Sequence, residues 1–180
     1  MTRKLPSRTE ALRFLRETRC SQSVIDHCKS VAELAVEIAK ALKRNGLSID
    51  LQLVEIGSLL HDIGRAETHS VHHAVAGARI AKSLGLPESL VSIIRRHVGG
   101  GITSKTAKQL GWPDDIYVPQ TLEEKIVSYA DKLIEGDQRV PIERTIEKFR
   151  INGLPPSAIR RLRRMNEEMT ALIGDCECQP

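Results

Sequence analysis

The stretch Leu59-Leu60-His61-Asp62-Ile63-Gly64 places two strong metal ligands, a histidine and an aspartate, side by side where an apolar helix is expected to end. Adjacent residues inside a helix do not face each other, so one compact centre cannot easily use both from mid-helix. At a helix end the backbone can turn, and both side chains can converge. The stretch therefore predicts a polar centre at the end of a buried helix.

Four further candidate ligands occupy comparable places: His27, His73, His97 and Asp131. Each falls on the apolar side of an expected helix or extends that side by one turn, as His27 does one turn before Val31. Helical phase makes His73 the inward residue and the neighbouring His72 the outer one. His69 lies on an expected loop and is interpreted as a surface residue.

A single inward histidine is more often a hydrogen-bonded core residue than a ligand. Four such histidines are harder to explain this way, because every neutral ring brings polar atoms that need partners. Asp62 and Asp131 add carboxylates on apolar faces, and no lysine or arginine falls on the same stripes. A bound metal would satisfy all these groups at once.

The composition favours helices. Apolar residues make up 41% of the 180-residue chain and aromatic residues only 3%, and alanine, leucine and isoleucine dominate. With no convincing strand pattern, we expect an all-α bundle of six to eight helices. The expected segments are an N-terminal helix in 1–20, a metal-binding core in 21–136, and covering helices with a tail in 137–180, all in one globular unit.

The sequence also limits where in the cell the protein is expected. No apolar run approaches the roughly 20 residues that cross a bilayer, and no secretory signal is visible, so we expect a cytoplasmic protein without membrane contact.

The residues 99–120 form an irregular insertion directly after His97, equally consistent with a lid and with a surface excursion. Cys176 and Cys178 lie in a polar tail, where a frayed terminus is favoured over a metal or redox role. The net charge is +4, and for Arg160–Arg164 we favour a solvated helix face over RNA contact.

His27, His61-Asp62 and Asp131 follow the order and context of the HD-domain phosphohydrolase superfamily, which this chain resembles from about His27 to Ile134. Leu-Leu-His-Asp-Ile-Gly resembles its most specific signature, and Ser-Tyr-Ala-Asp-Lys-Leu around Asp131 looks like its final aspartate motif. The resemblance implies that His27, His61, Asp62 and Asp131 bind one divalent metal. His73 and His97 are similar to two extra histidines of subfamilies with two ions, in which the aspartate of the His-Asp pair bridges both.

That resemblance implies a nucleotide or related phosphoester or phosphoanhydride as substrate, cleaved by a metal-activated hydroxide. Asp62 and Asp131 would orient the hydroxide, and Arg65 would bind the substrate phosphate; Arg95, Arg96 and Lys132 are weaker phosphate-binding candidates. The mixed nitrogen and oxygen ligands suit one or two ions of Mn, Fe, Co, Ni or Zn better than Mg.

The spacing around His73 and His97 looks most like that of small HD proteins that cleave dinucleoside polyphosphates, followed by 5′-nucleotidases. The chain lacks the Glu-Asp pair of the (p)ppGpp hydrolase branch, since residues 65–68 read Arg-Ala-Glu-Thr. Two other readings stay open: a di-iron oxygenase of the HD type, and a non-catalytic nucleotide- or RNA-binding module.

Overall fold

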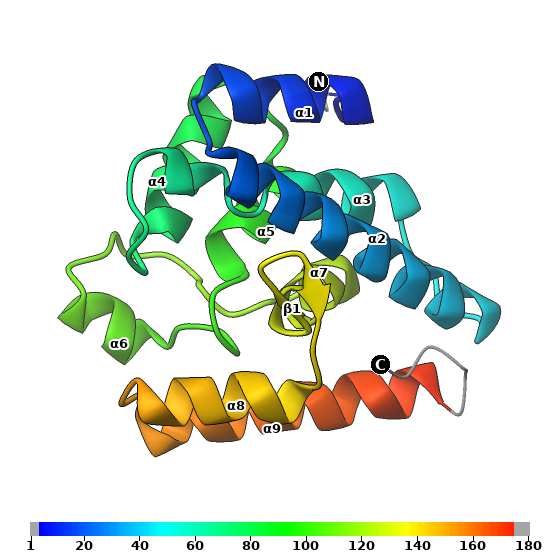
Figure 1. Ribbon diagram of the computed structural model, residues 1–180, viewed down its shortest axis with the longest axis vertical. Coiled ribbons are helices and arrows are strands. Elements are labelled where there is room, and N and C mark those ends of the chain that lie inside the picture. Colours follow the sequence, from blue (N-terminus) through cyan, green and yellow to red (C-terminus); the bar gives the residue numbers. More distant parts are fainter. Residues whose placement is uncertain (1–3, 175–180) are drawn as a thin grey trace.

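The computed structural model describes residues 4–174, and nearly all of its regular structure is helical (Figure 1). The helices, in chain order, are α1 (Arg8–Glu17), α2 (Gln22–Arg44), α3 (Leu51–Leu60), the 3-10 helix η1 (Ile63–Ala66), α4 (His73–Ser83), α5 (Glu88–Arg96), α6 (Ser104–Gln109), α7 (Leu122–Lys132), α8 (Ile142–Ile151) and α9 (Pro156–Ile173). The predicted all-α fold is confirmed.

Helix α2 is the central element, and it packs along α3 and α7. Side chains start all three helices, because Ser21, Asp50 and Thr121 each accept a hydrogen bond from the backbone three residues later. The apolar stripe of α2 is fully buried from Val31 to Leu42. These three helices bring the expected positions of His27, His61 and Asp131 into the middle of the molecule.

A close backbone approach fixes η1 against α4. A Cβ atom added at Gly64 would lie 1.9 Å from the carbonyl oxygen of His73 and 2.5 Å from the amide nitrogen of Gly77. Only glycine allows this approach. The final residue of the opening stretch thus holds the start of α4, and with it His73, beside Asp62.

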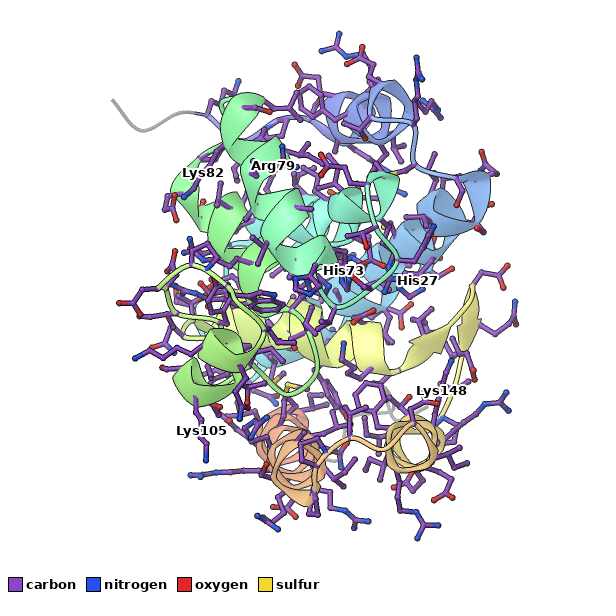
Figure 2. The ribbon with its side chains drawn as sticks, turned by 90° about the vertical axis from the view of Figure 1, so that its left-hand side faces the viewer. His27, His73, Arg79, Lys82, Lys105 and Lys148 are labelled. Carbon is purple, nitrogen blue, oxygen red and sulfur yellow. The ribbon has the colours of Figure 1, made fainter. Side chains whose placement is uncertain are left out.

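Helices α8 and α9 run antiparallel as a separate layer beneath the other helices (Figures 1 and 2). Four residues of α9 are buried, at the spacing of one helix face: Leu162, Met165, Met169 and Ile173. They join the core cluster that contains the apolar residues of α2 and α7. The layer is therefore an integral part of the core and not an appended tail.

One local feature differs from the sequence expectation of no strand. Ile134–Glu135 (β1) and Gln138–Arg139 (β2) form a two-stranded antiparallel hairpin directly after α7. Strands of two residues are too short to show any alternation of apolar and polar positions. Within residues 4–174, no helix is long and apolar enough to cross a lipid bilayer. Cys176 and Cys178 lie outside the described residues.

Candidate metal centre

All six side chains singled out in the sequence come together in the interior. His27 comes from α2, His61 and Asp62 follow the end of α3, His73 begins α4, His97 follows α5, and Asp131 lies near the end of α7. His27 and His73, labelled in Figure 2, lie close to each other between the upper helices and α7. His72 is exposed, as helical phase predicts, and so is His69.

Each of the four histidines uses Nδ1 to bond a backbone carbonyl. The distances are 2.7 Å from His27 to Gly136, 2.6 Å from His61 to Ser58, 2.7 Å from His73 to Ser70 and 2.8 Å from His97 to Ile94. A carbonyl oxygen only accepts, so Nδ1 must carry the hydrogen in every ring. In the neutral ring this leaves Nε2 with a free lone pair, which is the arrangement that a metal-binding histidine requires.

The four Nε2 atoms converge on the two carboxylates. Asp131 Oδ1 lies 3.0 Å from Nε2 of His27 and 3.4 Å from Nε2 of His61. Asp62 Oδ1 lies 3.1 Å from Nε2 of His73 and 3.4 Å from Nε2 of His97.

The second carboxylate oxygen of Asp62 faces the other histidine pair. Asp62 Oδ2 lies 3.9 Å from Nε2 of His27 and 3.7 Å from Nε2 of His61. The two oxygens of Asp62 therefore point toward two different pairs of histidines.

The donor set fits a divalent cation. Nε2 of His61 and Oδ1 of Asp62 are buried without a hydrogen-bond partner, and the Nε2 atoms of His73 and His97 face each other at 3.0 Å. Only a shared proton or a cation can lie between two such lone pairs. In each of two sets of side chains, all the donor atoms lie within 4.8 Å of one another. One set is His27, His61 and Asp131, and the other is His61, Asp62 and His97. These residues are positioned for metal binding.

Both carboxylates have an additional cationic partner that the apolar stripes did not predict. Arg65 Nε donates to Asp62 Oδ2, and Lys132 Nζ donates to Asp131 Oδ2. Lys132 is buried, although it follows Asp131 directly in the sequence. The histidine Nε2 atoms therefore call for a cation more strongly than the negative charge of the two aspartates does.

The electrostatics of the cluster keep its carboxylates ionised. Burial alone would raise the pKa of Asp62, but positive charge beside the Nε2 atoms of His61, His73 and His97, which protons supply when no metal is bound, outweighs it and holds the pKa well below its usual range. Burial also opposes ionisation of Asp131, and Lys132, His27 and His61 lower its pKa in the same way. For His97, burial lowers the pKa to about 4, so this ring is neutral near pH 7.

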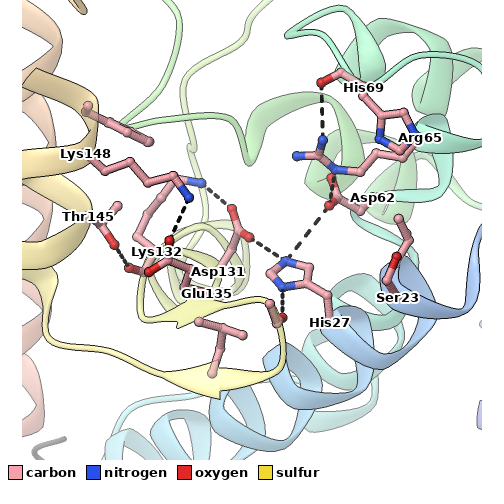
Figure 3. A pocket seen from close by; sticks show the side chains of 14 residues that line it. Ser23, His27, Asp62, Arg65, His69, Asp131, Lys132, Glu135, Thr145 and Lys148 are labelled. Carbon is pink, nitrogen blue, oxygen red and sulfur yellow. Dashed lines mark hydrogen bonds and ion pairs between the residues drawn. The ribbon is translucent and has the colours of Figure 1, made fainter. Parts of the chain in front are cut away.

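A pocket of about 410 Å³ opens onto one side of the cluster (Figure 3). Its lining comes from α2, the segment after α3, the end of α7, the β1–β2 hairpin and α8: Ser23, Val24, His27, Asp62, Arg65, His69, Asp131, Lys132, Ile134, Glu135, Gly136, Thr145, Lys148 and Phe149. His61, His73 and His97 do not line it. Solvent thus reaches the cluster past His27 and Asp131.

Two weaker sequence candidates point elsewhere. Arg95 pairs with Asp115 at 2.6 Å and Glu88 at 3.2 Å, and Arg96 pairs with Glu124 at 2.8 Å. Neither lines the pocket, so the interpretation of these arginines as phosphate ligands is not supported.

The insertion 99–120 also contributes nothing to the pocket lining. It packs beside α4, where Trp112 Nε1 donates a 2.9 Å hydrogen bond to Nδ1 of His72.

Comparison with known proteins identifies the family of this fold. The family model described as the HD domain matches residues 24–135, which contain all six converging side chains. The chain belongs to the HD-domain family. Members of this family bind divalent metals, and its hydrolases are metal-dependent phosphohydrolases.

Several relatives match most of this HD-domain chain. An uncharacterized protein of Methanocaldococcus jannaschii is 47% identical over 156 residues, covering 86% of this chain and 92% of the relative. A tRNA (cytidine(56)-2'-O)-methyltransferase of Thermoplasma volcanium is 41% identical over 94% of this chain. The chain spans only 48% of that methyltransferase.

Among solved structures, the HD domain of the Listeria monocytogenes phosphodiesterase PgpH, in complex with cyclic-di-AMP, has a TM-score of 0.54 and 18% sequence identity. The alignment covers 95% of this chain and 98% of that domain. At this identity the likeness supports the fold.

Proposed function

We propose that the protein is a metal-dependent phosphohydrolase that cleaves a phosphoester or phosphoanhydride bond of a nucleotide. The observation that carries this proposal is the set of four histidines whose Nδ1 atoms all bond backbone carbonyls, which leaves four Nε2 lone pairs aimed at Asp62 and Asp131. A hydrogen-bonded core histidine needs no such convergence. The open pocket beside it gives a substrate access.

The proposed ligands are His27, His61, Asp62, His73, His97 and Asp131, with Asp62 between two ions. The opposed directions of the two Asp62 oxygens support this arrangement, because each oxygen faces its own histidine pair. Nitrogen and oxygen donors in this ratio suit Mn, Fe, Co, Ni or Zn better than Mg.

When bound, such ions supply Lewis-acid activation of a water molecule and of a phosphoryl oxygen. The residues of the chain do the rest. Asp62 and Asp131 stay ionised and orient the attacking water. Arg65 lines the pocket while its Nε bonds Asp62 and its Nη1 donates to the carbonyl of His69 at 3.3 Å, so Nη2 is the guanidinium nitrogen that can bind a phosphoryl oxygen.

A substrate screen tests this function. The purified protein is loaded with Mn, Co, Ni or Mg and offered nucleoside mono- and diphosphates, dinucleoside polyphosphates and cyclic-di-AMP. We expect phosphate or nucleotide release with at least one substrate, and its loss by more than about 100-fold in Asp62→Ala. Full activity of a folded Asp62→Ala protein would contradict the proposal.

A second candidate is RNA binding through α9, favoured by the similarity to tRNA methyltransferases over most of the chain. Arg160, Arg163 and Arg164 are exposed, whereas Arg161 donates to the carbonyl of Gly101 at 3.1 Å. Replacing the three exposed arginines with glutamine should weaken tRNA binding and flatten its salt dependence. The same affinity in this variant and in an Arg79→Gln control, which changes an exposed arginine on α4, would exclude this surface.

A further inference from the structure

Helix α8 forms the outer wall of the pocket, and it lies outside the residues that match the HD-domain family. Its position is fixed by Thr145, whose Oγ1 donates a 2.6 Å hydrogen bond to the carbonyl of Lys132 at the end of α7. Residues three and four positions further along a helix share the same side. Lys148 and Phe149 therefore face the pocket together with Thr145.

Lys148 differs from the other lysine and arginine residues that line this pocket. Arg65 and Lys132 each bond a carboxylate of the metal centre, whereas Lys148 Nζ pairs with Glu135 Oε1 at 2.9 Å. Figure 3 shows Lys148 and Lys132 on one side of the Asp131–His27 pair and Arg65 on the other.

The ion pair between Lys148 and Glu135 is also easy to open. The two side chains are 55% and 33% exposed, and exposed ion pairs contribute at most about 1 kcal/mol. Arg144 pairs with the same carboxylate at 2.5 Å, so Glu135 keeps a partner when Lys148 leaves it. A phosphate in the pocket can therefore bind Lys148 at a small free-energy cost, because only the exposed ion pair with Glu135 has to open.

The same wall offers an apolar surface. Phe149 is half-buried, and it lines the pocket with the buried side chains of Val24 and Ile134. A volume of about 410 Å³ lies in the usual range for small-ligand sites. The pocket therefore combines the metal centre, a separate cation and a flat apolar side chain.

We propose that Lys148 determines specificity by binding a second phosphoryl group of the substrate, next to the one that is attacked, while Phe149 contacts the base. The preferred substrates are then nucleotides with two phosphoryl groups. This inference rests on the proposed phosphohydrolase function, since it places the first phosphoryl group at the metal centre.

The test compares Lys148→Met with Arg144→Met by calorimetric binding to the Mn-loaded protein. Both variants remove one cation and one ion pair with Glu135, but Arg144 does not line the pocket. The probes are AMP and the non-hydrolysable α,β-methylene analogue of ADP. We expect the wild-type protein to prefer the diphosphate analogue, and Lys148→Met to reduce this preference about fivefold, the size of one exposed ion pair. In Arg144→Met the preference should change less than about twofold.

Equal losses in the two variants, or a wild-type protein without preference for the diphosphate analogue, would overturn the inference. A second variant gives an opposite expectation: Glu135→Gln releases Lys148 and removes a negative charge, so it should bind the diphosphate analogue several-fold more tightly. Weaker binding would also count against the role of Lys148. The same preference measured for pApA against ApA distinguishes a 5′-phosphorylated dinucleotide from a nucleoside diphosphate as the natural form.

Different experimental results would reject the second phosphoryl site and the proposed phosphohydrolase function. Hydrolysis by the wild-type protein together with an unchanged preference in Lys148→Met would retain the phosphohydrolase and reject the second phosphoryl site. Absence of hydrolysis with every metal and substrate would reject the phosphohydrolase, whatever the binding results.

Discussion

The two halves of the centre differ in their access to solvent. In the open half, the side chains of His27 and Asp131 are 16% and 13% exposed and line the pocket. In the closed half, His73 and His97 are 6% and 2% exposed and do not line it. Asp62 lies between the halves. Within residues 4–174 the pocket therefore gives access to the open half, and the proposed selection of a substrate would depend on α2, the β1–β2 hairpin and α8.

The largest expected effect separates the halves by their metal content. Under the proposed two-ion arrangement, His27→Ala should lose the ion of the open half and keep that of the closed half, and His73→Ala should do the reverse. Both should lower turnover by at least about 100-fold, because even residues that merely orient a ligand cost 10- to 100-fold. Elemental analysis counts the ions per chain. If either variant loses all metal, the centre behaves as one site and the division is wrong.

The next effect concerns the backbone contact that joins the halves. Gly64→Ala should cost about 3 kcal/mol of unfolding free energy, because its Cβ would lie 1.9 Å from the carbonyl oxygen of His73. Urea unfolding measures this loss. The control Gly111→Ala has nothing within 4 Å and a φ of +69°, so it should cost only the left-handed strain of about 1 kcal/mol. Equal costs would show that the contact with α4 is unimportant.

The closed half should also make the chelator-treated protein sensitive to acid. Below pH 6.5 the unfolded chain protonates His97, whereas burial lowers the pKa of this ring to about 4 in the folded protein. The unfolded state therefore binds more protons in this window, and stability falls as the pH falls. Between about pH 6.5 and pH 5 the loss from this group is about 2 kcal/mol.

Urea unfolding at several pH values tests this slope. His97→Gln should flatten it, and His69→Gln, on an exposed loop, should keep it. A slope that is the same in His97→Gln and in the wild-type protein would assign the acid sensitivity to other groups.

The smallest effect concerns the insertion beside the closed half. Trp112→Phe removes the 2.9 Å hydrogen bond to His72 and should cost about 1 kcal/mol in stability. Turnover should change less than about twofold, because no residue of 99–120 lines the pocket. A large loss of turnover with little loss of stability would instead support the role of this segment as a lid.

Features that follow the repeat of a helix could be predicted from the sequence. The end of α3 and the choice of His73 over His72 both follow from spacing and turn residues. The opposed oxygens of Asp62 depend on how η1 packs against α4, which the glycine at position 64 permits but does not reveal.

The pocket wall could not be predicted in this way. Glu135 and Lys148 are 13 residues apart on different elements, and the hairpin that supplies the Gly136 carbonyl to His27 is too short for a pattern. The sequence indicates Lys132 only as a weak phosphate-binding candidate and does not reveal its bond to Asp131, because the two residues are adjacent, although the long lysine side chain can reach back to that carboxylate.

The bonds of His61 and His97 to the carbonyls three residues before them have a consequence for protein design. Ser58 and Ile94 lie in the last turn of α3 and α5, where backbone carbonyls lack helical partners. The imidazole caps the helix end, and the same hydrogen bond fixes its tautomer and points Nε2 away from the helix. Four consecutive residues therefore encode an oriented ligand without any support from a distant side chain. A helix that ends in histidine is a portable unit, which can be grafted onto another bundle wherever two helix ends meet.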